Sequence, residues 1–267
     1  MLIGSFVLLA LAAAALYAWT AGFVFWKVLL VFALSYLAVN VLFILLWGLV
    51  SLFIDTAKPR EKQFPLSRLG CNQISEFVCA YARLRVHVTG EEKLPQQGRF
   101  LMVCNHRSMF DPLIVLDKLR KYDISFVSKP SNMRIPIAGR IAYGAGFLSI
   151  NRENDREALR TILTAADYLK RDLCSMAIYP EGTRSKTGRM LPFHAGSFKI
   201  AQKANVPLVI ASVRGTDEAK KNLPFKRTDV YLDILEVLPA ERVKAESTQE
   251  LARYSRELME RKLEETT

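Results

Sequence analysis

Phe100-Leu-Met-Val-Cys104, followed by Asn105-His-Arg-Ser-Met-Phe-Asp111-Pro112, is the stretch that decides the fold of this chain. The first five residues are apolar, as in a buried strand, and Asp111 and Pro112 are typical of a helix start. The stretch therefore predicts a strand, a short connection and a helix, which together form the repeating unit of open α/β sheets. Ligand sites in such sheets lie at the carboxyl ends of the strands, where this connection is expected.

The connection contains His106 and Asp111, a histidine and a carboxylate five residues apart. In a continuous helix the two side chains would lie about 140° apart around the axis, so only a bend lets them meet. A carboxylate that fixes the tautomer of an imidazole prepares it to act as a general base toward an alcohol. The spacing alone is weak evidence, because a surface histidine beside a helix-capping aspartate also produces it.

The first 54 residues are almost free of charge, and Lys27 is their only charged side chain. About 20 apolar residues cross a bilayer, so the region is long enough for one span or for a hairpin of two. A signal peptide is the competing interpretation, but it has a basic start and a short apolar core, and this stretch has neither. We expect two membrane spans, near residues 2–20 and 28–50.

Basic residues follow the apolar region in Lys58-Pro-Arg-Glu-Lys62, and the chain has a net charge of +11. Cations beside a span favour the cytoplasmic side, so we expect the remaining domain on the cytoplasmic face of the cell membrane. A basic domain at a bilayer favours membrane lipids or another anionic substrate as its partner. Nucleic acid is the other usual partner of such charge. We expect no nucleic acid, because the chain has no recognised binding motif and a membrane anchor argues against it.

Four cysteines, Cys71, Cys79, Cys104 and Cys174, are dispersed along the chain and form no C-x-x-C pair. The chain has only three histidines as well, so a structural zinc site has little support and we expect no metal. Three of the cysteines lie in apolar surroundings and resemble small core residues. Reduced thiols fit a cytoplasmic domain.

Strand-like and helix-like segments alternate beyond residue 82. We expect strands at 84–89, 100–104, 124–128, 146–150, 174–179, 207–213 and 229–237, and helices at 112–120, 154–171, 196–204 and 247–264. This alternation predicts an α/β fold with a mixed, largely buried sheet flanked by helices. We therefore divide the chain into a membrane-embedded helical hairpin (1–54), an amphipathic linker on the membrane surface (55–82) and a cytoplasmic α/β domain (83–267).

A second polar stretch, Tyr179-Pro-Glu-Gly-Thr-Arg184, directly follows one of the predicted strands. Gly182 allows the backbone to approach a ligand, Thr183 adds a hydroxyl donor, and Arg184 offers a planar guanidinium suited to phosphate. Glu181 is placed to accept a hydrogen bond from a substrate hydroxyl. A polar hairpin turn is the less favoured explanation of the stretch taken by itself.

Two further cations also follow predicted strands. Arg152 ends the run Gly146-Phe-Leu-Ser-Ile-Asn-Arg152, and Lys129 follows the strand at 124–128. Either one is explained as a solvated charge when considered alone. Cations placed just past several strands, together with the base-type residue His106, are what a phosphate-bearing alcohol needs.

On these stretches the chain resembles the phospholipid and glycerol acyltransferase family, and within it the bacterial 1-acylglycerol-3-phosphate acyltransferases. Three family blocks match in order and spacing: N-H-x-S-x-x-D at Asn105, His106, Ser108 and Asp111, an apolar run ending in arginine at Gly146–Arg152, and P-E-G-T-R-S at Pro180–Ser185. Asn151 stands where many members have aspartate, and Ile210 replaces the second proline of a V-P-x-x-P block. The match covers roughly residues 85–240.

The resemblance implies acyl transfer from a thioester, acyl-CoA or acyl-acyl carrier protein, to the free hydroxyl of 1-acylglycerol-3-phosphate (lysophosphatidic acid). The product would be phosphatidic acid for phospholipid synthesis, made without a cofactor. Glycerol 3-phosphate or another lysophospholipid is the alternative acceptor. The alternative that is not an enzyme is a catalytically silent, lipid-binding membrane protein.

The resemblance also implies roles for the site residues. His106 would be the general base and Asp111 the group that orients it, with Asn105 and Ser108 as supporting residues. The substrate-binding set would be Lys129, Arg152, Glu181, Gly182, Thr183 and Arg184. Within this set the cations would bind the phosphate, and residues 181–183 would shape the glycerol site.

Overall fold

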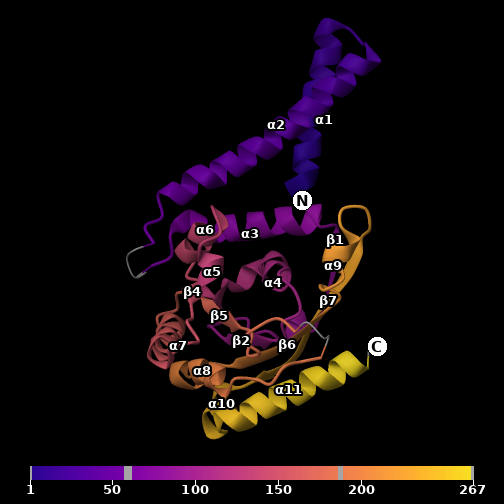
Figure 1. Cartoon of the computed structure of the whole chain (residues 1–267). Coiled ribbons are helices and arrows are strands. Elements are labelled where there is room, and N and C mark those ends of the chain that lie inside the picture. Colours follow the sequence, from indigo (N-terminus) through magenta and orange to yellow (C-terminus); the bar gives the residue numbers. More distant parts are fainter. Residues whose placement is uncertain (1, 57–61, 186–188, 266–267) are drawn as a thin grey trace. The chain divides into compact units, whose positions relative to one another are not determined.

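The computed structural model describes residues 2–56, 62–185 and 189–265. The chain divides into two compact units, Met1–Asp55 and Thr56–Thr267, both of which are drawn in Figure 1. Residues 58–61, part of the basic stretch behind the predicted orientation in the membrane, lie outside the described residues.

The first unit is an antiparallel hairpin of two apolar helices, α1 (Leu2–Ala21) and α2 (Phe25–Leu52). The ring of Phe6 packs edge-on against that of Phe43, with 5.6 Å between the centroids, and Ala10 is fully buried. Most of the other leucines remain exposed, which is typical of helices that contact lipid rather than water. Both helices are long and apolar enough to cross a membrane, and they suggest membrane association.

The second unit is built on a seven-stranded sheet with the strand order β1-β7-β6-β2-β5-β3-β4. The strands are β1 (Leu84–Thr89), β2 (Leu101–Cys104), β3 (Ile124–Ser128), β4 (Leu148–Ser149), β5 (Ser175–Ile178), β6 (Leu208–Arg214) and β7 (Thr228–Leu238). Every neighbouring pair is parallel except β6 with β7. The carboxyl ends of β6, β2, β5, β3 and β4 therefore meet at one edge, which we call the carboxyl edge.

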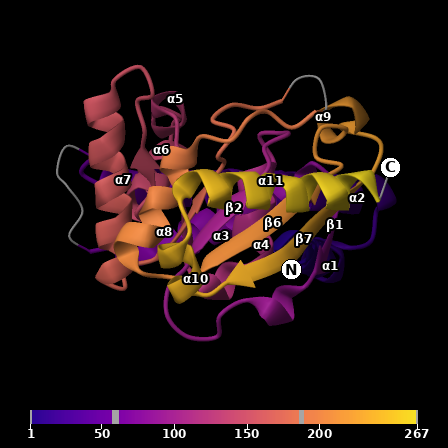
Figure 2. The same ribbon diagram turned by 90° about the horizontal axis from the view of Figure 1, so that it is seen from below.

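Helices cover both faces of this sheet (Figures 1 and 2). On one face lie α3 (Pro65–Tyr81), α4 (Asp111–Lys118), α5 (Pro130–Met133) and α6 (Ala138–Gly144). On the other lie α7 (Asp155–Lys170), α8 (Lys199–Ala204), α10 (Ala240–Ala245) and α11 (Thr248–Glu264), and α9 (Ala219–Asn222) lies in the β6–β7 connection. The mixed, largely buried sheet flanked by helices that the sequence predicts is confirmed.

The main core lies between the sheet and the second group of helices. Fully buried side chains of β2, β5 and β6, among them Leu101, Met176 and Ile210, pack there with side chains of α7, α8 and α11. The predicted start of α7 is confirmed, because the side chain of Asn154 accepts a hydrogen bond from the backbone N–H of Glu157. Capping and an apolar face together explain why this helix forms where the sequence pattern predicts it.

Helix α3 packs against α4 and α6, although we expected residues 55–82 to form a linker on the membrane surface. Arg68 fixes it to the sheet by donating hydrogen bonds to the carbonyl oxygens of Ile124 (2.5 Å) and Ala145 (3.0 Å). The helix is therefore part of the α/β unit. Leu66 and Leu69 are exposed on it, and contact of this face with a bilayer stays a prediction.

The four cysteines are all free and buried. Burial raises the pKa of Cys71 to about 12 and that of Cys79 to about 12. Burial also raises the pKa of Cys104 and of Cys174. Alkylation requires the thiolate, and a thiol with such a pKa is ionised in only about one molecule in 10⁴ at pH 8.

We therefore predict that iodoacetamide at pH 8 leaves all four thiols unmodified in the folded protein and modifies all four after unfolding. Intact-mass spectrometry of the detergent-solubilised protein, with and without denaturant, counts the alkylated thiols. Rapid alkylation of Cys71 or Cys79 in the folded state would contradict their burial.

Candidate functional site

The stretches singled out in the sequence follow four strands that are neighbours in the sheet. His106 follows β2, residues 181–184 follow β5, Lys129 follows β3 and Arg152 follows β4. These strands are parallel, so all four connections leave the sheet at its carboxyl edge. The topology therefore gathers residues that lie far apart in the sequence where α/β sheets place their ligand sites.

The predicted pair of His106 and Asp111 is in hydrogen-bond contact, with 2.8 Å between Nδ1 and Oδ2. The same carboxylate oxygen accepts the backbone N–H groups of Arg107 (2.7 Å) and Ser108 (2.8 Å), and these bonds hold the connection as a bend. Asp111 is fully buried, whereas the imidazole remains 18% exposed. With Nδ1–H donating to the carboxylate, Nε2 is the ring nitrogen left to accept a proton.

The start of α4 differs from the sequence prediction in one detail. The residues Asp111 and Pro112 predicted a helix start with the aspartate at the cap, whereas Asp111 is the first residue of the helix and Phe110 is its N-cap. Its carboxylate instead turns back to the N–H groups of the preceding connection. Pro112 lies in the first turn, as predicted, where its missing N–H costs no hydrogen bond.

Thr216 is a site residue that sequence reasoning missed. Its hydroxyl donates to Asp111 Oδ1 at 2.5 Å, and the side chain is fully buried. The two residues are 105 positions apart, and Thr216 belongs to none of the motifs. The one signal in the sequence was its place just past the predicted strand at 207–213.

Asn105 continues the pairing of β2 with β6 through its side chain. Its amide donates to the carbonyl of Val213 (2.9 Å) and accepts the N–H of Val213 (2.7 Å). The side chain therefore takes the place of one more backbone residue in the ladder. This fixes the point where the connection to His106 leaves the sheet.

Glu181 lies beside the pair but is closed to solvent, with only 3% of its surface exposed. One carboxylate oxygen accepts the backbone N–H of His106 (2.6 Å) and the other accepts that of Leu191 (2.8 Å). Burial raises the pKa of Glu181, although the two N–H groups oppose this effect. We expected Glu181 to accept a substrate hydroxyl, whereas the structure gives it the position of a support for the loops.

Gly182 lies close to the side chains of Arg152 and His194, and its predicted approach to a ligand stays a prediction. Its φ is +76°, and a Cβ atom built on it would lie 2.9 Å from Nη1 of Arg152 and 3.1 Å from Cδ2 of His194. Arg152 is an exposed residue, although partial burial of its guanidinium lowers its pKa. Within the described parts of the chain Arg152 has no ion-pair partner, which suits a guanidinium that receives a phosphate.

The remaining predicted residues lie on the surface of the carboxyl edge. Thr183 and Arg184 are exposed on the loop after β5, and Lys129 is exposed at the N-cap of α5. In the described residues neither cation forms an ion pair. The structure therefore places them near the pair in topology but shows no direct contact with it.

A stack of aromatic rings supports His106 and was not predicted. The imidazole lies flat on the ring of Tyr179, with 4.1 Å between centroids and 13° between planes. Tyr179 stacks in turn on Phe126 at 5.5 Å. Burial raises the pKa of Tyr179 well above its ordinary value, and its hydroxyl has no partner in the described residues. The stack therefore fixes the plane of the imidazole and excludes water from the ring face that contacts Tyr179.

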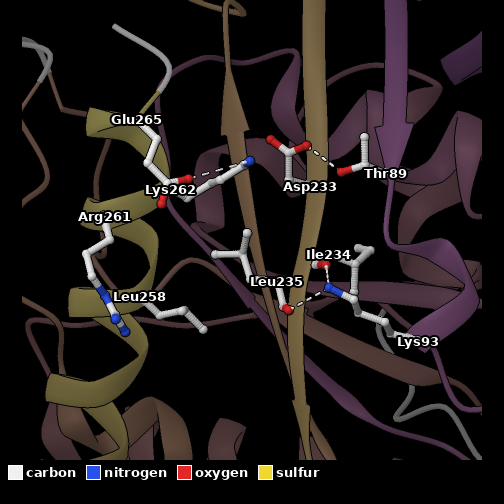
Figure 3. A pocket seen from close by; sticks show the side chains of 9 residues that line it. All are labelled: Thr89, Lys93, Asp233, Ile234, Leu235, Leu258, Arg261, Lys262 and Glu265. Atoms are coloured by element: carbon white, nitrogen blue, oxygen red, sulfur yellow. Dashed lines mark hydrogen bonds and ion pairs between the residues drawn. The ribbon is translucent and has the colours of Figure 1, made fainter.

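A pocket of about 270 Å³ lies elsewhere, between β7 and α11 (Figure 3). It is lined by Thr89, Lys93, Asp233, Ile234, Leu235, Leu258, Arg261, Lys262 and Glu265. Lys93 already donates to the carbonyls of Ile234 and Leu235. No predicted site residue lines it, and among the described residues no group of three His, Cys, Asp or Glu side chains is placed to hold a metal.

Comparisons with known proteins identify the family of the chain. The acyltransferase family model matches residues 85–214. The 1-acyl-sn-glycerol-3-phosphate acyltransferase of Salmonella typhimurium is 33% identical over 171 residues, which are 63% of this chain and 68% of the relative. The enzyme of the same name from Escherichia coli K12 is 32% identical over 171 residues, again 63% of this chain and 68% of the relative.

A solved structure is similar as well. The crystal structure of the 1-acyl-sn-glycerophosphate (LPA) acyltransferase, PlsC, from Thermotoga maritima aligns with a TM-score of 0.62 and 26% identity, over 74% of this chain and 79% of that one. The family match spans residues 85–214, which include the loops at the carboxyl edge that follow β2, β3, β4 and β5. The chain therefore belongs to the acyltransferase family.

Proposed function

We propose that the protein transfers an acyl group from a thioester to the free hydroxyl of 1-acyl-sn-glycerol-3-phosphate and so forms phosphatidic acid. The observation that carries the proposal is the 2.8 Å contact of His106 with Asp111, placed at the same sheet edge as the unpaired Arg152. The acceptor is inferred from the names of the relatives and from the family motifs.

His106 acts as the general base in this reaction. Its Nε2 takes the proton of the acceptor hydroxyl while the hydroxyl oxygen bonds to the thioester carbonyl carbon. The tetrahedral adduct then breaks its C–S bond, and the proton passes from the imidazolium to the leaving thiolate. The Asp111 carboxylate stabilises the imidazolium through Nδ1–H, at 2.8 Å.

The acceptor is held through its phosphate. Arg152 lies against the backbone of Gly182, one residue from Glu181, which bonds to the backbone of His106. A phosphate bound by Arg152 is therefore connected to the base through the single loop that contains Glu181 and Gly182. Arg184 and Lys129, both exposed at this edge, supply the further positive charge.

The apolar hairpin holds the enzyme at the cell membrane, with the α/β unit on the cytoplasmic face. Acceptor and product are both lipids, so a membrane anchor keeps the site near them. The donor is acyl-CoA or acyl-acyl carrier protein, both of which are water-soluble thioesters. Turnover with each donor in turn identifies the one that the enzyme uses.

Removing the base tests the proposed reaction. We predict that His106→Ala lowers kcat by about 10²–10⁴-fold, because general-base catalysis contributes this much to the rate. Release of free thiol from each donor, measured with purified protein and lysophosphatidic acid, reports the rate. His87→Ala is the control, since His87 lies on edge strand β1 and bonds to Asp229. Full activity of His106→Ala would exclude the assigned base.

Removing the guanidinium tests the phosphate site. We predict that Arg152→Ala raises KM for lysophosphatidic acid about 10-fold to 100-fold, because a hydrogen bond to a charged group contributes about 1.5–3 kcal/mol. The change in kcat should be smaller. Arg156→Ala is the matched control, because Arg156 is an exposed arginine in the first turn of α7, shortly after Arg152 in the chain. An unchanged KM in Arg152→Ala would remove this residue from the phosphate site.

Glu181→Gln separates a support from a substrate ligand. The amide has one acceptor oxygen where the carboxylate uses two, so the N–H of His106 or of Leu191 loses its partner. We predict that the unsatisfied donor lowers the free energy of unfolding by about 1–3 kcal/mol, that kcat falls because the backbone of His106 is held less firmly, and that KM for the acceptor stays the same. If KM rises instead while kcat is kept, Glu181 binds the substrate hydroxyl as the sequence analysis expected.

A further inference from the structure

Residues 219–227, Ala-Lys-Lys-Asn-Leu-Pro-Phe-Lys-Arg, form a loop that we call the basic loop. It joins β6 to β7, which are antiparallel, so it lies at the carboxyl edge together with His106. Figure 2 shows α9, the first part of this loop, at the same edge as α5. The loop has four cations and no carboxylate.

Phe225 is the most exposed large apolar side chain among the described residues of the α/β unit, at 85%. Lys220, Lys226 and Arg227 surround it in the sequence, are exposed, and have no ion-pair partner in the described parts of the chain. An aromatic ring between cations is typical of elements that lie in the headgroup layer of an anionic membrane. In water, exposing the ring of Phe225 does not stabilise the folded protein.

The nearby acids offset only part of the charge of the basic loop, because Glu218 pairs with one of its four cations and Asp217 pairs with an arginine outside it. Asp217 bonds to Arg107 at 3.3 Å, and Glu218 bonds to Lys221 at 2.8 Å. The third acid, Asp229, bonds to His87 at 2.7 Å on the neighbouring edge strand. The surface around Phe225 therefore keeps a positive surplus.

The inner side of the basic loop is joined to the catalytic connection. Ala219 and Leu223 pack with Phe110, the residue before Asp111, in a small separate apolar core. Just before the loop, Thr216 donates its hydrogen bond to Asp111. A surface that binds the outer side of the loop is therefore held at a fixed place relative to His106.

We propose that the basic loop is a membrane contact of the α/β unit, separate from the apolar hairpin. Phe225 enters the headgroup layer, and Lys220, Lys226 and Arg227 bind anionic lipid headgroups. The contact brings the carboxyl edge to the bilayer, where a lipid acceptor is found. It does not depend on which acceptor or donor the enzyme uses.

The buried cysteines make a direct test possible. Phe225→Cys, labelled with an environment-sensitive fluorophore in the full-length protein, reports insertion in proteoliposomes with and without phosphatidylglycerol. We expect a blue shift, and quenching by lipids spin-labelled near the headgroup, only with phosphatidylglycerol and reversed by salt. The control label at Glu257→Cys is at an exposed position of α11, on the sheet face that α7 and α8 also cover, and should not respond. Equal spectra in both membranes would overturn the proposal.

A triple variant, Lys220→Gln, Lys226→Gln and Arg227→Gln, tests the effect on turnover. We expect activity in vesicles containing phosphatidylglycerol to fall about tenfold, since each cation near an anionic surface adds to binding. Activity in detergent micelles should stay unchanged, which separates this contact from the catalytic site. The matched control replaces Arg160, Lys170 and Lys203, exposed cations of α7 and α8, and should keep full activity in both.

An acidic donor protein is the other partner that a basic loop fits. If the triple variant loses activity only with acyl-acyl carrier protein, and keeps it with acyl-CoA on the same vesicles, the loop binds that donor and the membrane proposal is wrong. Unchanged activity on anionic vesicles with both donors would also overturn it.

Discussion

A single buried carboxylate, that of Asp111, organises the candidate site. It accepts four hydrogen bonds, from the imidazole of His106, the backbone N–H groups of Arg107 and Ser108, and the hydroxyl of Thr216. Burying a carboxylate is costly unless such donors replace its water. The bonds that meet this cost are the same bonds that bend the connection and orient the base. The stability of the bend and the proposed catalysis therefore depend on the same set of hydrogen bonds.

The surroundings of the pair extend this arrangement to neighbouring strands. Asn105 hydrogen-bonds the connection to β6, and Glu181 hydrogen-bonds it to the loop after β5. The ring of Tyr179 stacks on the imidazole of His106. Each support comes from a strand beside β2, or from β2 itself. A parallel arrangement is needed for this, because only parallel neighbours place their following loops at one edge. The proposed acceptor site around Arg152 and Gly182 lies at the same edge.

Much of the fold could be predicted from local patterns. The apolar helices α1 and α2, the seven strands, and the capped helix α7 all have signals within a short window of sequence. Helices α5, α6, α9 and α10 have seven residues or fewer, too short to show a helical period, and were not predicted. The packing of α3 was not foreseen either. It depends on Arg68 reaching carbonyls that lie 56 and 77 residues further along the chain.

The candidate site was predictable to the extent that its residues lie in motifs. His106, Asp111, Gly182 and Arg152 were found this way, and the structure brings them to one edge. The support by Glu181 and the bond from Thr216 were not, because they link positions 75 and 105 residues apart. A motif identifies a glutamate or a threonine, but only the folded sheet determines which backbone it meets.

The tautomer of His106 tests the central claim most directly. The chain has only three histidines, so ¹⁵N-histidine labelling gives an NMR spectrum that His87 and His194 variants can assign. If Asp111 orients the base, neutral His106 has its proton on Nδ1, hydrogen-bonded to Asp111, and a proton-free Nε2. A proton on Nε2, with Nδ1 free, would contradict the assignment of His106 as the base. That nitrogen could then not accept the proton of the hydroxyl.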